Sequence, residues 1–224
     1  ELSPEEFIIN HLSTFFKPVK QQPRDVVLFG FGRIGRLLAR ELVAQEGSGK
    51  QLRLRAVAVR RIDAASLHKR ASLLKIDSVH GDFPGTVKVD EENLALIING
   101  RPVYFIPTPD PTEADYTAYG IENALLIDNS GAFRDDVALA KHLEGKGVDR
   151  VLLTAPGKGI KNIVHGVNQN DIDTKKDRIV SAASCTTNAI SPVLKVMNET
   201  FGIERGHLET IHAYTNDQNL VDNM

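Results

Sequence analysis

The fold is decided by residues 25–35, which read Asp25-Val26-Val27-Leu28-Phe29-Gly30-Phe31-Gly32-Arg33-Ile34-Gly35. The four apolar residues after Asp25 predict a buried β-strand, because a strand covered on both faces is apolar without alternation. A tight glycine turn follows, and then a helix from Ile34 to about Glu46, which ends before Gly47. Strand, G-x-G-x-x-G turn and helix in this order are typical of a dinucleotide-binding unit.

Each glycine of the turn has a physical role in such a unit. Gly30 permits the tight turn, Gly32 lets the backbone approach a pyrophosphate, and Gly35 lets the helix pack closely against the strand. The N-terminus of the helix faces the negative phosphates. We therefore expect a bound dinucleotide; the alternative is a glycine turn with a purely structural role.

Strand and helix patterns alternate along most of the chain. Helices are predicted over residues 64–74 and 135–144. Strands are predicted at residues 52–59, 94–98, 103–106, 124–127, 151–154 and 179–182. This alternation indicates an α/β fold with a Rossmann-type, doubly wound, mostly parallel sheet.

The first 23 residues have a different pattern. They begin with Ser3-Pro4-Glu5-Glu6, the spacing of a capping box with proline at the first helical position. An apolar stripe follows, formed by Ile8, Leu12, Phe15 and Phe16. We expect an N-terminal helical extension that packs on the body or on a neighbouring subunit, rather than a membrane or regulatory helix.

Composition bounds the partners and the compartment. The 224 residues carry a formal net charge of −2, which gives no reason to expect nucleic acid or an anionic membrane as a main partner. No apolar run approaches the roughly 18 residues of a membrane span, and the N-terminus lacks the features of a signal peptide. The single cysteine cannot form an intrachain disulfide. We expect a soluble, cytoplasmic protein.

The end of the second strand bears on the choice of cofactor. An acidic residue there hydrogen-bonds the ribose hydroxyls of NAD, whereas an arginine accommodates the 2′-phosphate of NADP. This chain has Arg60-Arg61-Ile62-Asp63, with the arginines where the acid is expected. NAD or NADP both stay open; the arginines favour acceptance of NADP, and a solvated basic turn is the alternative.

One cysteine and one histidine are the candidate catalytic pair. Cys185 lies where the strand at 179–182 gives way to a helix running to about Thr200, and the helix N-terminus favours a thiolate. Its neighbours are polar, which argues against a buried packing cysteine. His212 lies in a predicted strand over residues 208–214, and a helix followed by a return strand can bring it back beside Cys185.

Seven segments together resemble the phosphorylating glyceraldehyde-3-phosphate dehydrogenases, in the order of that family. They are residues 30–36 (GFGRIGR), 77–81 (DSVHG), 129–133 (NSGAF), 154–156 (TAP), 166–168 (GVN), 183–188 (ASCTTN) and 211–218 (IHAYTNDQ). The Ser-Cys-Thr-Thr-Asn motif is highly specific to the family. The separation of Cys185 and His212, 212 − 185 = 27 residues, also matches.

The resemblance implies a reaction and a set of residues. Cys185 would attack the aldehyde of glyceraldehyde 3-phosphate with His212 as general base, hydride would pass to the nicotinamide, and inorganic phosphate would release an acyl phosphate from the thioester. The family's phosphate contacts match Ser184, Thr186 and Thr215. Its cofactor contacts match Arg33, Ile34, Ser130 and Thr154. The family also implies a homotetramer.

The chain departs from the family pattern at several positions. The family's Asn-Asp pair is replaced by Arg60-Arg61, and Pro109 stands where an arginine usually precedes Asp110-Pro111. Ala189 replaces a second cysteine. We expect a helical extension over 1–23, the dinucleotide-binding domain over 24–182, and over 183–224 the start of an α+β catalytic domain that is incomplete. The 224 residues alone are expected to bind cofactor weakly and to show little activity.

Two other functions compete with this one. A relative that oxidises erythrose 4-phosphate would use the same pair, although Thr215 favours glyceraldehyde 3-phosphate with inorganic phosphate. A non-catalytic dinucleotide-binding or interaction protein would keep the fold, and the intact Cys185 and His212 speak against it.

Overall fold

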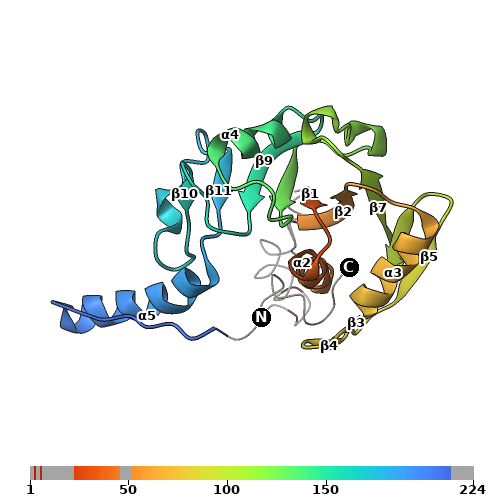
Figure 1. Ribbon diagram of the computed structural model, residues 1–224. Helices are drawn as coiled ribbons and strands as arrows, with labels where there is room; N and C mark the ends of the chain where they lie inside the picture. Colours follow the sequence, from red (N-terminus) through yellow and green to blue (C-terminus); the bar gives the residue numbers. More distant parts are fainter. Residues whose placement is uncertain (1–2, 4–5, 7–22, 46–51, 213–224) are drawn as a thin grey trace.

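The computed structural model describes residues 3, 6, 23–45 and 52–212, and its centre is a nine-stranded sheet (Figure 1). The strands lie in the order β10-β11-β9-β8-β1-β2-β7-β6-β5. The strands are β1 (Arg24–Phe29), β2 (Leu52–Val59), β5 (Val87–Asp90), β6 (Ala95–Ile98), β7 (Arg101–Pro107), β8 (Ala124–Asp128), β9 (Val148–Leu153), β10 (Lys161–Asn162) and β11 (Ile179–Ser181). A separate pair is formed by β3 (Ile76–Asp77) and β4 (Gly81–Asp82).

Seven neighbouring strands, from β10 to β7, are parallel, and the last two, β6 and β5, are antiparallel. The chain runs from β1 to β2 on one side, and later places β8 on the other side of β1. The carboxyl ends of β2 and β8 therefore flank that of β1, which is the switch point where open α/β sheets bind ligands. The predicted doubly wound, mostly parallel fold is confirmed.

Helices cover both faces of the sheet, except for the last one, Cys185–Phe201, which has no buried residue and extends away from the sheet (Figure 1). The elements are α2 (Arg33–Ala44), α3 (Ala64–Lys75), α4 (Asp136–Ala140), α5 (Cys185–Phe201) and the 3-10 turns η1 (Pro111–Glu113), η2 (Thr117–Tyr119), η3 (Lys141–Leu143) and η4 (Gln169–Asp171). Helices α2 and α3 pack with Val26 and Leu28 of β1 in one apolar core, and α4 packs with Val27 in the other. Adjacent residues of β1 therefore face opposite cores, as expected of a strand buried on both sides.

Several predicted elements end elsewhere. The helix predicted over 135–144 is divided into α4 and η3, and strand β9 begins at Val148 rather than at residue 151. The strand predicted over 208–214 is wrong for its described part: residues 208–212 have no regular structure, and Ile211 is 95% exposed. A strand needs a partner for its backbone groups, and no described strand pairs with this segment.

The N-terminal extension is described only at Ser3 and Glu6. The backbone N–H of Ser3 donates to Glu6 Oε2 (2.9 Å), and that of Glu6 donates to Ser3 Oγ (3.2 Å). The predicted capping box is therefore confirmed. The apolar stripe from Ile8 to Phe16 lies outside the described residues.

Candidate functional site

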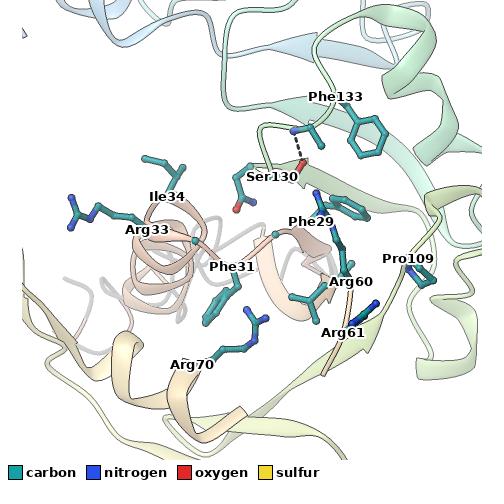
Figure 2. Close-up of a pocket in the computed structure, with 16 residues that line it drawn as sticks. Phe29, Phe31, Arg33, Ile34, Arg60, Arg61, Arg70, Pro109, Ser130 and Phe133 are labelled. Carbon is teal, nitrogen blue, oxygen red and sulfur yellow. Dashed lines mark hydrogen bonds between the residues drawn. The ribbon is translucent and has the colours of Figure 1, made fainter. Parts of the chain in front are cut away.

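A cavity of about 980 Å³ lies where β1, β2 and β8 end (Figure 2). We call it the central cavity. Most of its lining comes from three segments, namely the glycine turn, the end of β2 and the loop after β8. Arg70 of α3 and Pro109, which follows β7, complete it. Its lining residues are Phe29, Gly30, Phe31, Gly32, Arg33, Ile34, Ala58, Val59, Arg60, Arg61, Arg70, Pro109, Asn129, Ser130, Ala132 and Phe133.

At two glycines of the turn, neighbouring protein atoms occupy the space that a Cβ would need, and at the third this space is open. Gly30 has φ +96°, and a Cβ there would lie 3.1 Å from Ser130 Cα. A Cβ on Gly35 would lie 2.6 Å from the carbonyl oxygen of Gly30. A Cβ on Gly32, by contrast, would meet no atom within 4 Å. The open space at Gly32 fits a pyrophosphate approaching the backbone.

The first turn of α2 is prepared for an anion. Its N-cap is Gly32, which has no side chain to accept hydrogen bonds from the N–H groups of that turn. Such groups need an acceptor from solvent or ligand, and they carry the positive end of the helix dipole. The dinucleotide turn predicted from the sequence therefore has the geometry that a phosphate requires.

The central cavity is basic. Four arginines line it, namely Arg33, Arg60, Arg61 and Arg70. The described residues that line it include no carboxylate. The nearest acid in sequence to the end of β2, Asp63, is the N-cap of α3. Its carboxylate accepts from the backbone N–H of Ser66 (2.7 Å), and Ser66 Oγ accepts from the backbone N–H of Asp63 (3.0 Å). Hydrogen bonds to the Asp63 carboxylate from the backbone N–H and the side chain of Ser66 lower its pKa.

The loop after β8 is held in place by hydrogen bonds to a buried carboxylate. Asp128 Oδ1 accepts from the backbone N–H of Ser130 (2.8 Å) and from its hydroxyl (2.7 Å). Asp128 Oδ2 lies 2.9 Å from Nε2 of His142, and neither side chain is exposed. The His142 ring lies edge-on to Phe29 and Phe133, at centroid distances of 4.6 and 4.9 Å. The buried pair of Asp128 and His142 thus contacts both the end of β1 and the loop after β8, which line the central cavity.

Thr154 lies at the end of β9 and does not line the central cavity. Its backbone N–H and its hydroxyl both donate to the carbonyl oxygen of Asp128, at 3.0 and 3.1 Å. The strand ends of β8 and β9 are joined by these bonds. The other residues expected at the cofactor do line the cavity, with the exception of Gly35, which packs beneath the turn.

Cys185 is held by a strained turn at the start of α5. Ala183 has φ +60°, a left-handed conformation that costs a non-glycine residue about 1–2 kcal/mol. Its backbone N–H donates to Ser181 Oγ (2.9 Å), and Asn188 Nδ2 donates to the carbonyl oxygens of Ala182 (2.7 Å) and Ser184 (2.9 Å). These bonds fix the turn, so that Cys185 is exposed at the first position of the helix.

The two predicted phosphate ligands beside Cys185 are placed differently. Ser184 is the N-cap of α5: its Oγ accepts from the backbone N–H of Thr187 (2.9 Å) and lies 2.7 Å from Thr187 Oγ1. Thr186 Oγ1 lies 3.3 Å from Nε2 of His212. The histidine is thus brought to the residue after Cys185, although no hydrogen bond joins it to Cys185 within the described chain. Thr215 lies outside the described residues.

Sequence reasoning missed three parts of this arrangement. Arg70 follows Asp63 by 70 − 63 = 7 residues, two helical turns, so the periodicity of α3 was a usable signal. The pairing of Asp128 with His142 and the left-handed Ala183 left no local signal, because each depends on contacts between segments distant in the chain. Among the described residues, no cluster of side chains suits a metal ion, and no helix could cross a membrane.

Comparison with known proteins adds the following. A family model described as "Glyceraldehyde 3-phosphate dehydrogenase, NAD binding domain" matches residues 24–136, and one described as "Glyceraldehyde 3-phosphate dehydrogenase, C-terminal domain" matches residues 184–224. A glyceraldehyde-3-phosphate dehydrogenase-like protein of Pseudomonas aeruginosa (strain UCBPP-PA14) is 60% identical over 200 residues, which cover 89% of this chain and 43% of the relative.

Two further relatives carry the name glyceraldehyde-3-phosphate dehydrogenase. That of Zymomonas mobilis is 38% identical over 88% of this chain and 56% of its own length. Glyceraldehyde-3-phosphate dehydrogenase 2 of Bacillus subtilis is 38% identical over 88% of this chain and 55% of its own length. The chain therefore spans about half the length of the curated relatives it matches.

Proposed function

Because the chain belongs to the glyceraldehyde-3-phosphate dehydrogenase family, we propose that the whole protein oxidises glyceraldehyde 3-phosphate with a nicotinamide cofactor and inorganic phosphate. The product is 1,3-bisphosphoglycerate. The observation that carries the proposal is the exposed Cys185 at the first position of α5, next to Thr186, whose hydroxyl contacts His212. The homotetramer implied by the family resemblance stays a prediction, as does the division into domains at residues 23 and 182.

In this mechanism Cys185 is the nucleophile and His212 the base. His212 removes the thiol proton, the sulfur of Cys185 forms a bond to the aldehyde carbon, and His212 returns the proton to the aldehyde oxygen, giving a thiohemiacetal. His212 next accepts the proton of the new hydroxyl as hydride leaves the carbon, so that a thioester remains on Cys185. A bound nicotinamide cofactor supplies the acceptor for that hydride. An oxygen of inorganic phosphate then attacks the thioester carbon, and the Cys185 thiolate leaves.

The phosphate groups of this reaction need hydrogen-bond donors near Cys185. We assign this role to Ser184, Thr186 and Thr215. The first two flank Cys185 at the N-terminus of α5, where hydroxyls and backbone N–H groups suit an anion. Ser184 also caps the helix, so its hydroxyl serves two purposes.

For the cofactor, we propose a preference for NADP over NAD. The glycine turn holds the pyrophosphate, with Arg33 and Ile34 beside it, Ser130 and Thr154 belong to the nicotinamide side, and Arg60 and Arg61 take the 2′-phosphate. Support comes from the charge of the central cavity, whose described lining residues include arginines and no carboxylate. The hydrogen bonds of Asp63 within the cap of α3 add to it, because they engage the acid that could have held ribose hydroxyls.

Steady-state kinetics of the whole protein test the reaction. We expect aldehyde oxidation that requires inorganic phosphate, and we expect Cys185→Ala to lower kcat about 10³-fold or more, because it removes the nucleophile. Ala189→Ser, a change of similar size on the same helix, should leave kcat within about twofold. Turnover by the Cys185→Ala variant at the wild-type rate would sink the mechanism.

The same assay compares NADP with NAD. A higher kcat/KM with NADP is expected, and Arg60→Ala with Arg61→Ala should reduce the preference about tenfold by removing charge-assisted hydrogen bonds. A clear preference of the wild-type protein for NAD would refute the role of the two arginines and leave the reaction itself untouched.

A further inference from the structure

The central cavity contains a cation that the glycine turn and the end of β2 do not explain. Arg70 comes from α3, yet it lines the same cavity as Arg60 and Arg61. Figure 2 shows its side chain extending from α3 towards Phe31 and the end of β2. The end of β2 is therefore approached by guanidinium groups from two different elements.

Arg70 differs from Arg60 and Arg61 in its surroundings. The latter two are exposed, whereas Arg70 is only partly accessible. Burial, and then the charge of nearby Arg36, lower the pKa of Arg70, whereas the charge of Asp63 raises it by less. A partly buried guanidinium near a like charge gains more electrostatic free energy from pairing with an anion than an exposed guanidinium does, because the local dielectric is lower.

Arg33, the fourth arginine of the cavity, is directed elsewhere. Its Nε lies 3.9 Å from Oδ2 of the buried Asp77, and Figure 2 shows its side chain extending away from Arg70. Arg33 therefore lies closest to the carboxylate of Asp77, whereas Arg70, which also feels the charge of Asp63, lines the cavity.

We propose that Arg70 is a specificity-determining residue, which binds the 2′-phosphate of NADP from the α3 side while Arg60 and Arg61 bind it from the β2 side. The proposal rests on the function proposed above, and it adds the residue that discriminates between the two cofactors. A planar guanidinium offers paired N–H donors to phosphate oxygens, and the 2′-phosphate is the group by which NADP differs from NAD. Arg70 would thus contribute nothing to the binding of NAD.

The test uses two nucleotides that differ in that phosphate alone. Binding of adenosine 2′,5′-bisphosphate and of adenosine 5′-monophosphate to the whole protein is measured by calorimetry, without any turnover. Arg70→Met should weaken binding of the bisphosphate about 30-fold, which corresponds to the loss of one charge-assisted contact. It should change the affinity for the monophosphate less than twofold. Arg70→Lys keeps the charge without the paired donors, so its affinity for the bisphosphate should lie between those of the wild type and of Arg70→Met.

Lys69→Met is the matched control, because it removes one positive charge from the adjacent, exposed position of α3. It should leave both affinities within about twofold. Loss of both nucleotides in Arg70→Met and Arg70→Lys alike would overturn the proposal, since it would mean a role in the shape of the cavity. Unchanged bisphosphate affinity in either variant, with the wild type still preferring the bisphosphate, would also overturn it and leave Arg60 and Arg61 as the phosphate ligands. A wild type that does not distinguish the nucleotides would instead refute the NADP preference.

Discussion

Asp77 shows how a single buried carboxylate is kept charged. Its side chain is 1% exposed, and burial alone would raise its pKa. The hydrogen bonds that it accepts outweigh burial: from His80 Nδ1 (2.9 Å), from the backbone N–H of His80 (2.9 Å) and from that of Val79 (3.0 Å). Together they lower the pKa of Asp77 to about 2.

Asp77 is therefore expected to make stability depend on pH. Its folded pKa lies below the unfolded value of about 3.9, so its contribution is present above about pH 4 and is lost as the pH falls towards 2. The shift corresponds to about 2 kcal/mol at neutral pH. Urea unfolding of the wild type and of Asp77→Asn should differ by up to this amount at pH 7.

The difference between the two proteins should narrow between pH 4 and pH 2. Asp82→Asn, at an exposed position on β4, is the control and should follow the wild type at every pH. If the Asp77→Asn curve ran parallel to the wild-type curve down to pH 2, the carboxylate would not be the source of the effect.

Whether a site residue could be predicted depended on how local its signal is. Gly30, Gly32, Arg60 and Arg61 stand within short motifs whose spacing carries the chemistry; they line the central cavity, and their contacts with a cofactor stay a prediction. Arg70 reaches the cavity because α3 packs against α2 and the strands β5 and β6, a relation that no short motif encodes. A return of His212 to Cys185 was predicted through a strand; the structure instead brings His212 to the neighbouring Thr186, and residues 208–212 form no strand.

At the level of elements, η3 is joined to the end of β8 by a buried hydrogen bond. His142 belongs to η3 and Asp128 ends β8. Removal of the imidazole would leave Asp128 Oδ2 buried without this donor, which costs about 3 kcal/mol. Ser130, in the loop after β8, donates two hydrogen bonds to the same carboxylate. The link therefore bears on the cofactor loop as well as on stability.

We expect His142→Leu to lower the free energy of unfolding by about 3 kcal/mol and to raise KM for the cofactor more than it lowers kcat. His142→Gln, which can donate to Asp128, should recover part of both. Lys141→Gln, at the exposed neighbouring position of η3, should match the wild type in urea unfolding and in kinetics. A His142→Leu protein of wild-type stability would contradict the assigned support.

Elements with strong periodicity were predicted, and those that depend on partners were not. Helix α2 and strand β1 have uniform apolar or helical patterns, and their bounds lie within a residue or two of the prediction. Strand β5 (VKVD) was missed because its apolar and polar alternation extends over only four residues. It exists as a strand through its antiparallel pairing with β6.

In the whole molecule, β1 connects the two apolar cores, since its residues alternate between them. Leu28 is fully buried on the side of α2 and α3, while Tyr116 is 1% exposed on the other side. Leu28→Ala should lower the free energy of unfolding by about 3 kcal/mol through the cavity that it leaves. Because β1 serves both cores, far-ultraviolet circular dichroism and tyrosine fluorescence should report the same shifted midpoint.

Val137→Ala, at a position that is 74% exposed, is the comparison variant and should shift neither signal. Separate midpoints for the two signals in Leu28→Ala would mean that the cores unfold independently. The order of strands that creates this coupling was not predictable from the sequence, because it depends on which distant strands pair.

The cap of α3 has a consequence for protein engineering. Asp63 is the acid closest in sequence to the end of β2, and it is therefore the first candidate for shifting the proposed NADP preference towards NAD. Its carboxylate, however, starts a helix that carries Arg70. Turning Asp63 towards the ribose would unfasten α3, so a redesign has to introduce a new acid at position 60 and leave Asp63 where it is.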